Sequence, residues 1–137
     1  MTEARIAGFF LIRATIFIMS EIQNNLFEET LRCIQITDPF TKAAETQKLY
    51  QQWCAGDMDK QSMGDPIRIP VPGRPSKPDL VDPHKVPKRG FNSTQGLIKL
   101  AHAIAHIEFN AINLALDAVY RFREMPNHFV SDWLKVA

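Results

Sequence analysis

The sequence has few of the residues and patterns from which a function is usually inferred. It contains two cysteines, Cys33 and Cys54, too few for a disulfide framework and without the spacing of a metal knuckle. It also has no glycine-rich nucleotide-binding loop and no evident pairing of a nucleophile with a general base. We therefore expect two half-buried thiols in a reducing compartment, and a cytoplasmic protein.

Neither charge nor hydrophobic runs indicate a nucleic-acid or membrane partner. The 16 basic and 15 acidic residues nearly balance, so neither nucleic acid nor an anionic membrane is expected as a partner. The apolar stretch 6–19 is interrupted by Arg13 and is shorter than the about 20 apolar residues of a membrane-spanning helix. We interpret residues 1–18 as an upstream, non-native extension, with Met19 as the natural start. An export or membrane segment and an additional core helix are the alternatives.

Apolar residues at helical spacing predict a helical hairpin within residues 19–56. The apolar positions of its first helix, about residues 22–36, are Ile22, Leu26, Phe27, Leu31 and Ile34. Asp38 is the expected N-cap of the second helix, and Pro39 its first residue. This helix runs to about residue 54 and ends at Gly56. Its apolar positions are Phe40, Ala43, Ala44, Tyr50 and Trp53.

Proline changes the character of the chain in residues 57–92. Seven of the nine prolines lie there. Because proline lacks a backbone donor and restrains the residue before it, neither a helix nor a central strand is expected. Acidic and basic residues are interleaved along the segment, which argues against a nucleic-acid patch. We predict an extended, solvated strap that crosses a helical surface.

Residues 93–137 predict one long helix and the beginning of another. Ser93 or Asn92 is the expected N-cap of the long helix, which reaches about Arg123. A last helix begins near Asn127 and meets the end of the chain without a glycine or a polar tail. We interpret it as an interrupted helix.

Glu108 is the one charged residue on an apolar stripe of the long helix. At about 100° per residue, its apolar neighbours on the stripe are Leu97, Ala101, Ile104, Ala105, Ala111, Ile112, Ala115 and Val119. The alanines allow a neighbouring helix to come close, so we expect this face to be buried. A buried ionised carboxylate costs several kcal/mol unless it is compensated. A metal ion, a basic or hydrogen-bonding partner, a proton, or a partly solvated position would each satisfy Glu108.

Two histidines lie on another side of the same helix. His102 and His106 have the i, i+4 spacing of zinc ligands, but they project about 120° and 160° away from Glu108. They share that side with Asn110, Asn113, Asp117 and Tyr120. We expect a polar face packed against the strap or the hairpin, and a separate two-histidine metal site is the alternative.

Four segments of the chain are distinctive, namely GDPIRIPVPGRPSKPDLV, PKRGFNSTQG, LAHAIAHIEFNAINLALDAVYRF and FVSDWLKVA. Together they resemble a bacterial family of unknown function, number 455, which is assigned to the ferritin-like superfamily. The likeness covers about residues 24–137. Ferritin-like carboxylate proteins hold two iron or manganese ions in a four-helix bundle, with single Glu ligands on two helices and Glu-x-x-His pairs on the other two. By position, Glu108 matches the lone Glu of the first bundle helix.

The resemblance implies an all-α fold in which residues 93–137 are the N-terminal part of a ferritin-like domain. They would form the first long helix and the start of the second helix of an incomplete four-helix bundle. The full-length family would then carry iron or manganese for redox or oxygenase chemistry. This chain would end before the Glu-x-x-His pair, hold no metal stably and be inactive alone. Its partner would be the missing C-terminal half or a second copy of the chain. The alternative is a non-catalytic interaction module in which Glu108 is only a buried polar core residue.

Overall fold

A computed structural model of the protein describes residues 25–61, 64–77, 79, 82 and 93–137. These residues contain four helices, α2 (Leu26–Gln35), α3 (Pro39–Ala55), α4 (Thr94–Arg121) and α5 (Asn127–Val136). The only β-type pairing among them is an isolated bridge between Asn25 and Asp59. The prediction of an all-α fold is therefore confirmed. The interpretation of residues 1–18, the proposed start at Met19 and the apolar position Ile22 lie outside the described residues.

The helices begin where polar side chains cap their first turns. Asp38 Oδ1 accepts a hydrogen bond from the Thr41 amide at 2.8 Å, and Pro39 follows directly as the first residue of α3. Ser93 Oγ accepts from the Gly96 amide at 3.1 Å at the start of α4. Both predicted caps are confirmed, as is the end of α3 at Gly56, which has the left-handed φ of 79° that favours glycine.

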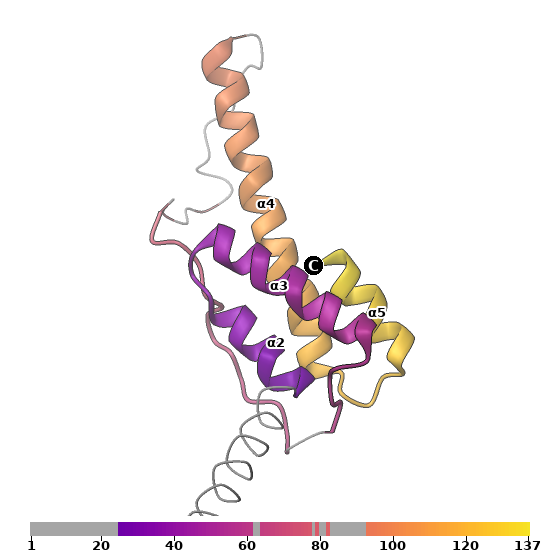
Figure 1. Ribbon diagram of the computed structural model, residues 1–137. Coiled ribbons are helices and arrows are strands. Elements are labelled where there is room, and N and C mark those ends of the chain that lie inside the picture. The colour runs from indigo at the N-terminus through magenta and orange to yellow at the C-terminus, as the bar shows by residue number, and fades with distance from the viewer. Residues whose placement is uncertain (1–24, 62–63, 78, 80–81, 83–92) are drawn as a thin grey trace, which may run out of the picture.

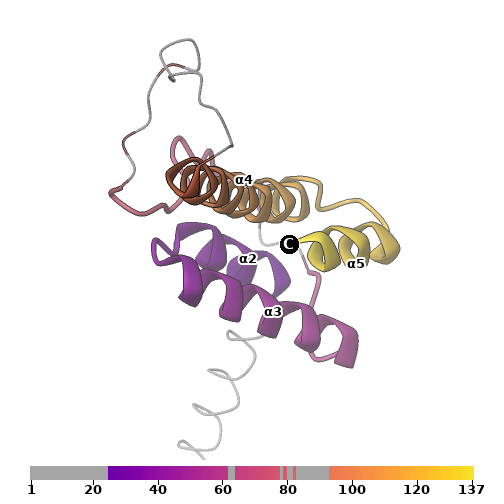
Figure 2. The same cartoon turned by 90° about the horizontal axis from the view of Figure 1, so that it is seen from above.

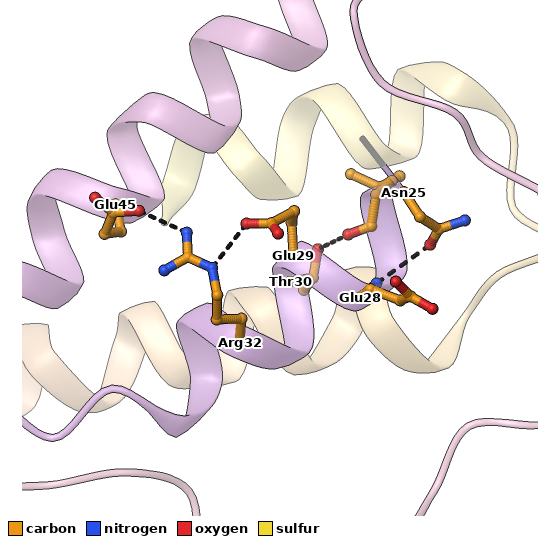
Figure 3. A network of polar contacts seen from close by, with 7 residues as sticks. Asn25, Glu28, Glu29, Thr30, Arg32 and Glu45 are labelled. Carbon is orange, nitrogen blue, oxygen red and sulfur yellow. Dashed lines mark hydrogen bonds and ion pairs between the residues drawn. The ribbon is translucent and has the colours of Figure 1, made fainter. Parts of the chain in front are cut away.

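Asn25 caps α2 and also ties it to the segment after α3. Its Oδ1 accepts hydrogen bonds from the amides of Phe27 and Glu28, at 3.0 and 3.2 Å, and its Nδ2 donates to the carbonyl of Gln61 at 2.9 Å. Figure 3 shows this cap beside Glu28. We expect Asn25→Ala to lower the free energy of unfolding by about 1–2 kcal/mol, because it removes both the cap and the link.

Urea denaturation followed by circular dichroism measures this effect. Asn25→Asp is the matched variant, because it keeps the acceptor of the cap and loses only the donor to Gln61. It should therefore be less destabilising than Asn25→Ala. Equal losses in the two variants would show that the cap itself contributes nothing.

Two helices, α2 and α5, pack against the second half of α4, and α3 packs against both of them. α2 contacts α3 and α4, and α5 contacts the same two helices. Seen from above, α4 and α5 form one layer and α2 and α3 form the other (Figure 2). The core between the layers is built from Leu26, Phe27, Cys33, Ile34, Leu49, Leu116, Val119, Tyr120, Val130 and Leu134. None of the four helices combines the length and apolarity that crossing a bilayer requires.

The first half of α4 extends beyond the other three helices (Figure 1). Its large apolar side chains are exposed: Leu97 by 57%, Ile104 by 49% and Ile107 by 63%. The long helix was predicted correctly, although it ends at Arg121 rather than at about Arg123. Half of it therefore lies outside the core.

The buried face of α3 agrees only in part with the predicted one, because Tyr50 and Trp53 pack against the core as predicted whereas Phe40 does not. The predicted apolar position Phe40 is 86% exposed, whereas Lys42, Thr46 and Leu49 are buried. These three have the i, i+4, i+7 spacing of one helix face. The prediction was incomplete because two of the inward-facing residues are polar.

An ion-pair network links α2 to α3 at the surface. Arg32 Nε lies 2.8 Å from Glu29 Oε2, and the Arg32 Nη2 atom contacts Glu45 on α3 (Figure 3). The hydrogen bond from Arg32 lowers the pKa of Glu45. Because these side chains are partly solvated, the network contributes little to stability and mainly fixes the orientation of the hairpin.

The proline-rich strap follows α2 and then reaches α4. Residues 64–77 contain no helix or strand and run beside α2 in Figure 1. The Ile67 amide donates to Tyr120 Oη at 3.2 Å, and the Gly73 amide donates to the carbonyl of Ile34 at 2.9 Å. The described part of the strap is thus extended and crosses a helical surface, as predicted.

Candidate functional site

Glu108 is exposed in the structure, so the expectation of a buried carboxylate is wrong for this chain. The stripe that carries it is buried only towards its C-terminal end, at Ala115 and Val119. Leu97 and Ile104, near its other end, are exposed. The physical reason is the length of α4: helices α2 and α5 pack against its second half, and no helix among the described residues covers the stripe in its first half.

A single carboxylate does not make a dinuclear metal centre. Among the residues that the structure describes, no three His, Cys, Asp or Glu side chains come together in a group that could hold a metal ion. Glu108 is thus the one ligand that this face of α4 offers. The donor set of the described chain does not fit two ions by itself, and further ligands would have to come from another segment or another chain.

The polar side of α4 packs against the hairpin and the strap, as predicted. Asn113 and Tyr120 are buried there, and Tyr120 accepts a hydrogen bond from the strap. His102 is exposed and His106 is partly buried. Asn110 donates to the backbone carbonyl of His106 at 2.9 Å. The expected polar packing surface therefore exists mainly in the second half of α4.

Lys42 is the most unusual residue of this surface, because its side chain is completely buried. Its ammonium donates to the carbonyls of Ile34 and Gly73 at 2.8 and 3.0 Å, and to Asn113 Oδ1. It also lies 4.8 Å from the centroid of the Phe109 ring. One lysine from α3 thus joins the end of α2, the strap and α4. Burial lowers the pKa of Lys42 to about 8.

Gly73 brings the strap against the end of α2. A Cβ atom at this position would lie 2.2 Å from the carbonyl oxygen of Gln35 and 2.6 Å from that of Ile36. Both are backbone atoms and cannot turn aside as a flexible side chain would. Only glycine therefore lets the strap approach closely enough for its carbonyl to reach Lys42.

A half-open cavity lies between the first half of α4 and the strap. Its volume is about 170 Å³. Apolar groups from three elements line it, namely Pro39, Pro75, Ala105 and Phe109. The basic or imidazole side chains along it are Arg74, Lys77, His102 and His106. The cavity therefore combines an apolar wall with two cationic side chains and two imidazoles.

Comparison with known proteins identifies the family. Residues 35–137, well over half of the chain, match the family model described as "Protein of unknown function (DUF455)". The chain belongs to the DUF455 family. The family resemblance stated from the sequence is thereby confirmed, whereas its ferritin-like detail stays a prediction.

The DUF455 chain is also similar to an uncharacterized protein of Haemophilus influenzae. The two are 53% identical over 70 residues, which covers 46% of this chain and 24% of the relative. The chain thus spans about a quarter of the length of the curated relative that it matches. No solved structure matches the DUF455 chain.

Two residues of this DUF455 site were missed by the sequence interpretation. The spacing of Lys42 could have indicated its burial, because it lies on the same face of α3 as Thr46, Leu49 and Trp53. Gly73 gave none, because a glycine among prolines is ordinarily a turn residue. The hydrogen bond from Lys42 to the carbonyl of Gly73 is therefore known only from the structure.

The cysteines of the DUF455 chain differ from each other. Both are free, but Cys33 is buried and Cys54 is exposed, so the expectation of two half-buried thiols is wrong. Burial raises the pKa of Cys33 to about 11. The Cys33 thiol therefore stays protonated at neutral pH, and a protonated thiol is a poor nucleophile.

Proposed function

We propose that this chain acts as a docking unit of a larger DUF455 assembly, in which the exposed stripe of α4 receives further helices. Glu108 would then be enclosed and serve as a ligand of an iron or manganese centre of the ferritin-like kind. Those helices would come from the rest of a longer family protein. The proposal places redox or oxygenase chemistry in the assembly and not in this chain alone.

One observation carries the proposal: an apolar helix face, with one carboxylate in its middle, stands uncovered beside a well-packed core. On this stripe, Leu97 is 57% exposed and Ile104 is 49% exposed. Contiguous apolar surface of this kind marks an interaction site in soluble proteins. The length of the H. influenzae relative supports the same idea, because three quarters of that protein lie beyond the region matched here.

The carboxylate favours a metal over a purely structural contact. When helices cover the stripe, an ionised Glu108 loses its water and must find a compensating cation or a proton. Its neighbours on the stripe are apolar and supply no such partner. A metal ion held together with carboxylates and histidines of the incoming helices would supply the charge.

The test is co-expression of this chain with the portion of the H. influenzae relative that it does not match. We expect a complex that contains iron or manganese, measured by elemental analysis. Glu108→Gln should leave the complex intact and reduce its metal content at least about tenfold, since ligand loss removes metal more readily than it unfolds a helix. Glu124→Gln, which changes an exposed glutamate after the end of α4, is the matched control.

Two results would contradict the proposal. Failure of the two polypeptides to associate would remove the docking role. A complex whose metal content is the same with Glu108 and with glutamine would remove the ligand role and favour the non-catalytic interaction module. A second copy of this chain is the competing occupant of the stripe, and light scattering of the chain alone would reveal such a homodimer.

We also propose a cytoplasmic location. It is supported by Cys33, whose thiol is shielded in the core, and by Cys54, which is a free, exposed thiol. Exposed free thiols persist in reducing compartments.

A further inference from the structure

We propose that the cavity between α4 and the strap binds a small aromatic carboxylate with a single ring. The chemistry is separate from that of Glu108, because the histidines of the cavity project from a different side of α4. The outcome of a binding test at this cavity is therefore independent of the metal proposal.

The size of the cavity matches one six-membered ring. Its volume is about 170 Å³, and an apolar protein cavity of about 150 Å³ is large enough to hold benzene. A fused double ring is too large to be enclosed in this volume. Because the cavity is half open, a substituent on the ring can extend to the solvent.

The wall of the cavity suits the faces and edges of an aromatic ring. Phe109 supplies an aromatic surface on α4, and it is 9% exposed. Pro39 and Pro75 supply rigid apolar surfaces from α3 and the strap. Aromatic rings pack in offset or edge-to-face contact with such groups, and each gains from the apolar area that it removes from water.

The charge around the cavity selects an anion. Arg74 and Lys77 come from the strap, and none of the described residues that line the cavity carries a carboxylate. Lys77 pairs with Asp79 at 2.6 Å, but both side chains are more than 70% exposed, so a ligand carboxylate can compete for it. The bound carboxylate would thus sit at the mouth, among cationic groups.

Lys42 adds a buried positive charge next to the cavity. Its ammonium lies 4.8 Å from the Phe109 ring centroid, and the hydrogen bonds that hold it go to neutral oxygen atoms. Charges in such a poorly solvated place act over a longer distance than surface charges. A ligand whose ring lies against Phe109 and whose carboxylate lies at the mouth therefore gains attraction from Lys42 without touching it.

The experiment is titration of the full chain with benzoate, followed by backbone amide NMR. We expect saturable shifts at residues of the cavity, including His106 and Phe109. Arg74→Gln, an exposed strap position, should weaken benzoate binding about fivefold. Ala105→Leu, which places a larger side chain in the cavity, should abolish it. Lys48→Gln on the exposed side of α3 is the matched charge control and should leave binding unchanged.

Two further probes decide which features of the ligand matter. Benzyl alcohol keeps the ring without the charge, and acetate keeps the charge without the ring, so both should bind at least about tenfold more weakly than benzoate. Benzyl alcohol binding as tightly as benzoate would overturn the anion part of the proposal, and acetate doing so would overturn the ring part. Absence of saturable shifts with benzoate, or unchanged benzoate binding in Ala105→Leu, would overturn the site itself.

Discussion

Replacing Lys42 with methionine should lower the free energy of unfolding by about 3 kcal/mol. Methionine fills a similar volume but cannot donate a hydrogen bond. The variant would leave the carbonyl of Gly73 and the amide oxygen of Asn113 without their donor, whereas the carbonyl of Ile34 would keep its bond from the Gly73 amide. A buried acceptor that loses its partner costs about 1–3 kcal/mol, so the sum over two acceptors outweighs the benefit of removing a buried charge.

Urea denaturation of Lys42→Met and of Lys48→Met provides the comparison. Lys48 lies on the same helix but is exposed, and its replacement should change stability by less than about 0.5 kcal/mol. If both variants lost the same small amount, Lys42 would be a solvated lysine and not the link between the strap and the helices.

The pH dependence of the free energy of unfolding, compared between the native chain and Lys42→Met, gives a second test of the buried Lys42. Because burial lowers its pKa from 10.5 in the unfolded chain to about 8, the folded state binds fewer protons than the unfolded state between these pH values. Stability contributed by this group should therefore rise as the pH increases from about 8 to about 10.5. The difference between the native chain and Lys42→Met should show this rise, and a difference independent of pH would contradict it.

Gly73→Ala should destabilise the protein by about 3 kcal/mol or more. The added Cβ would lie 2.2 Å from the carbonyl oxygen of Gln35 and 2.4 Å from its carbonyl carbon, so the strap must move away from α2. That movement would also weaken the hydrogen bond from the Gly73 amide to Ile34 and the bond from Lys42 to the Gly73 carbonyl.

Two measurements separate this effect from a general change in the strap. Ser76→Ala, at an exposed strap position, is the matched control and should be neutral within about 0.5 kcal/mol. Amide hydrogen exchange at residue 73 should become much faster in Gly73→Ala. Unchanged stability together with unchanged exchange would mean that the close approach of strap and α2 is wrong.

The sequence was sufficient to predict the helices and their caps. Asp38, Pro39, Gly56 and Ser93 act locally, within one turn of the helix end, so their effect does not depend on the rest of the fold. It was not sufficient to predict which faces are covered. Periodicity shows that the Glu108 stripe is apolar, but burial depends on which neighbour lies opposite, and that is a long-range property.

The difference between local signals and long-range contacts also explains why the predictions for α3 and the strap were incomplete. Lys42 was treated as polar and Phe40 as apolar. In the structure Lys42 is buried, with hydrogen bonds to Gly73 and Asn113, which are distant in the sequence, and Phe40 is 86% exposed. The importance of Gly73 depends on the backbone of residues 35 and 36, which lies far away in the sequence. Such contacts are set by tertiary packing and leave only a faint pattern in the local sequence.

Hydrogen exchange along α4 tests most directly the claim that its first half is an uncovered docking surface. In the chain alone, we expect the amides of residues 97–110 to exchange much faster than those of residues 113–120. In the complex with the unmatched portion of the H. influenzae relative, the first group should become protected. Equal protection of both halves in the chain alone, or no gain of protection on association, would contradict the account.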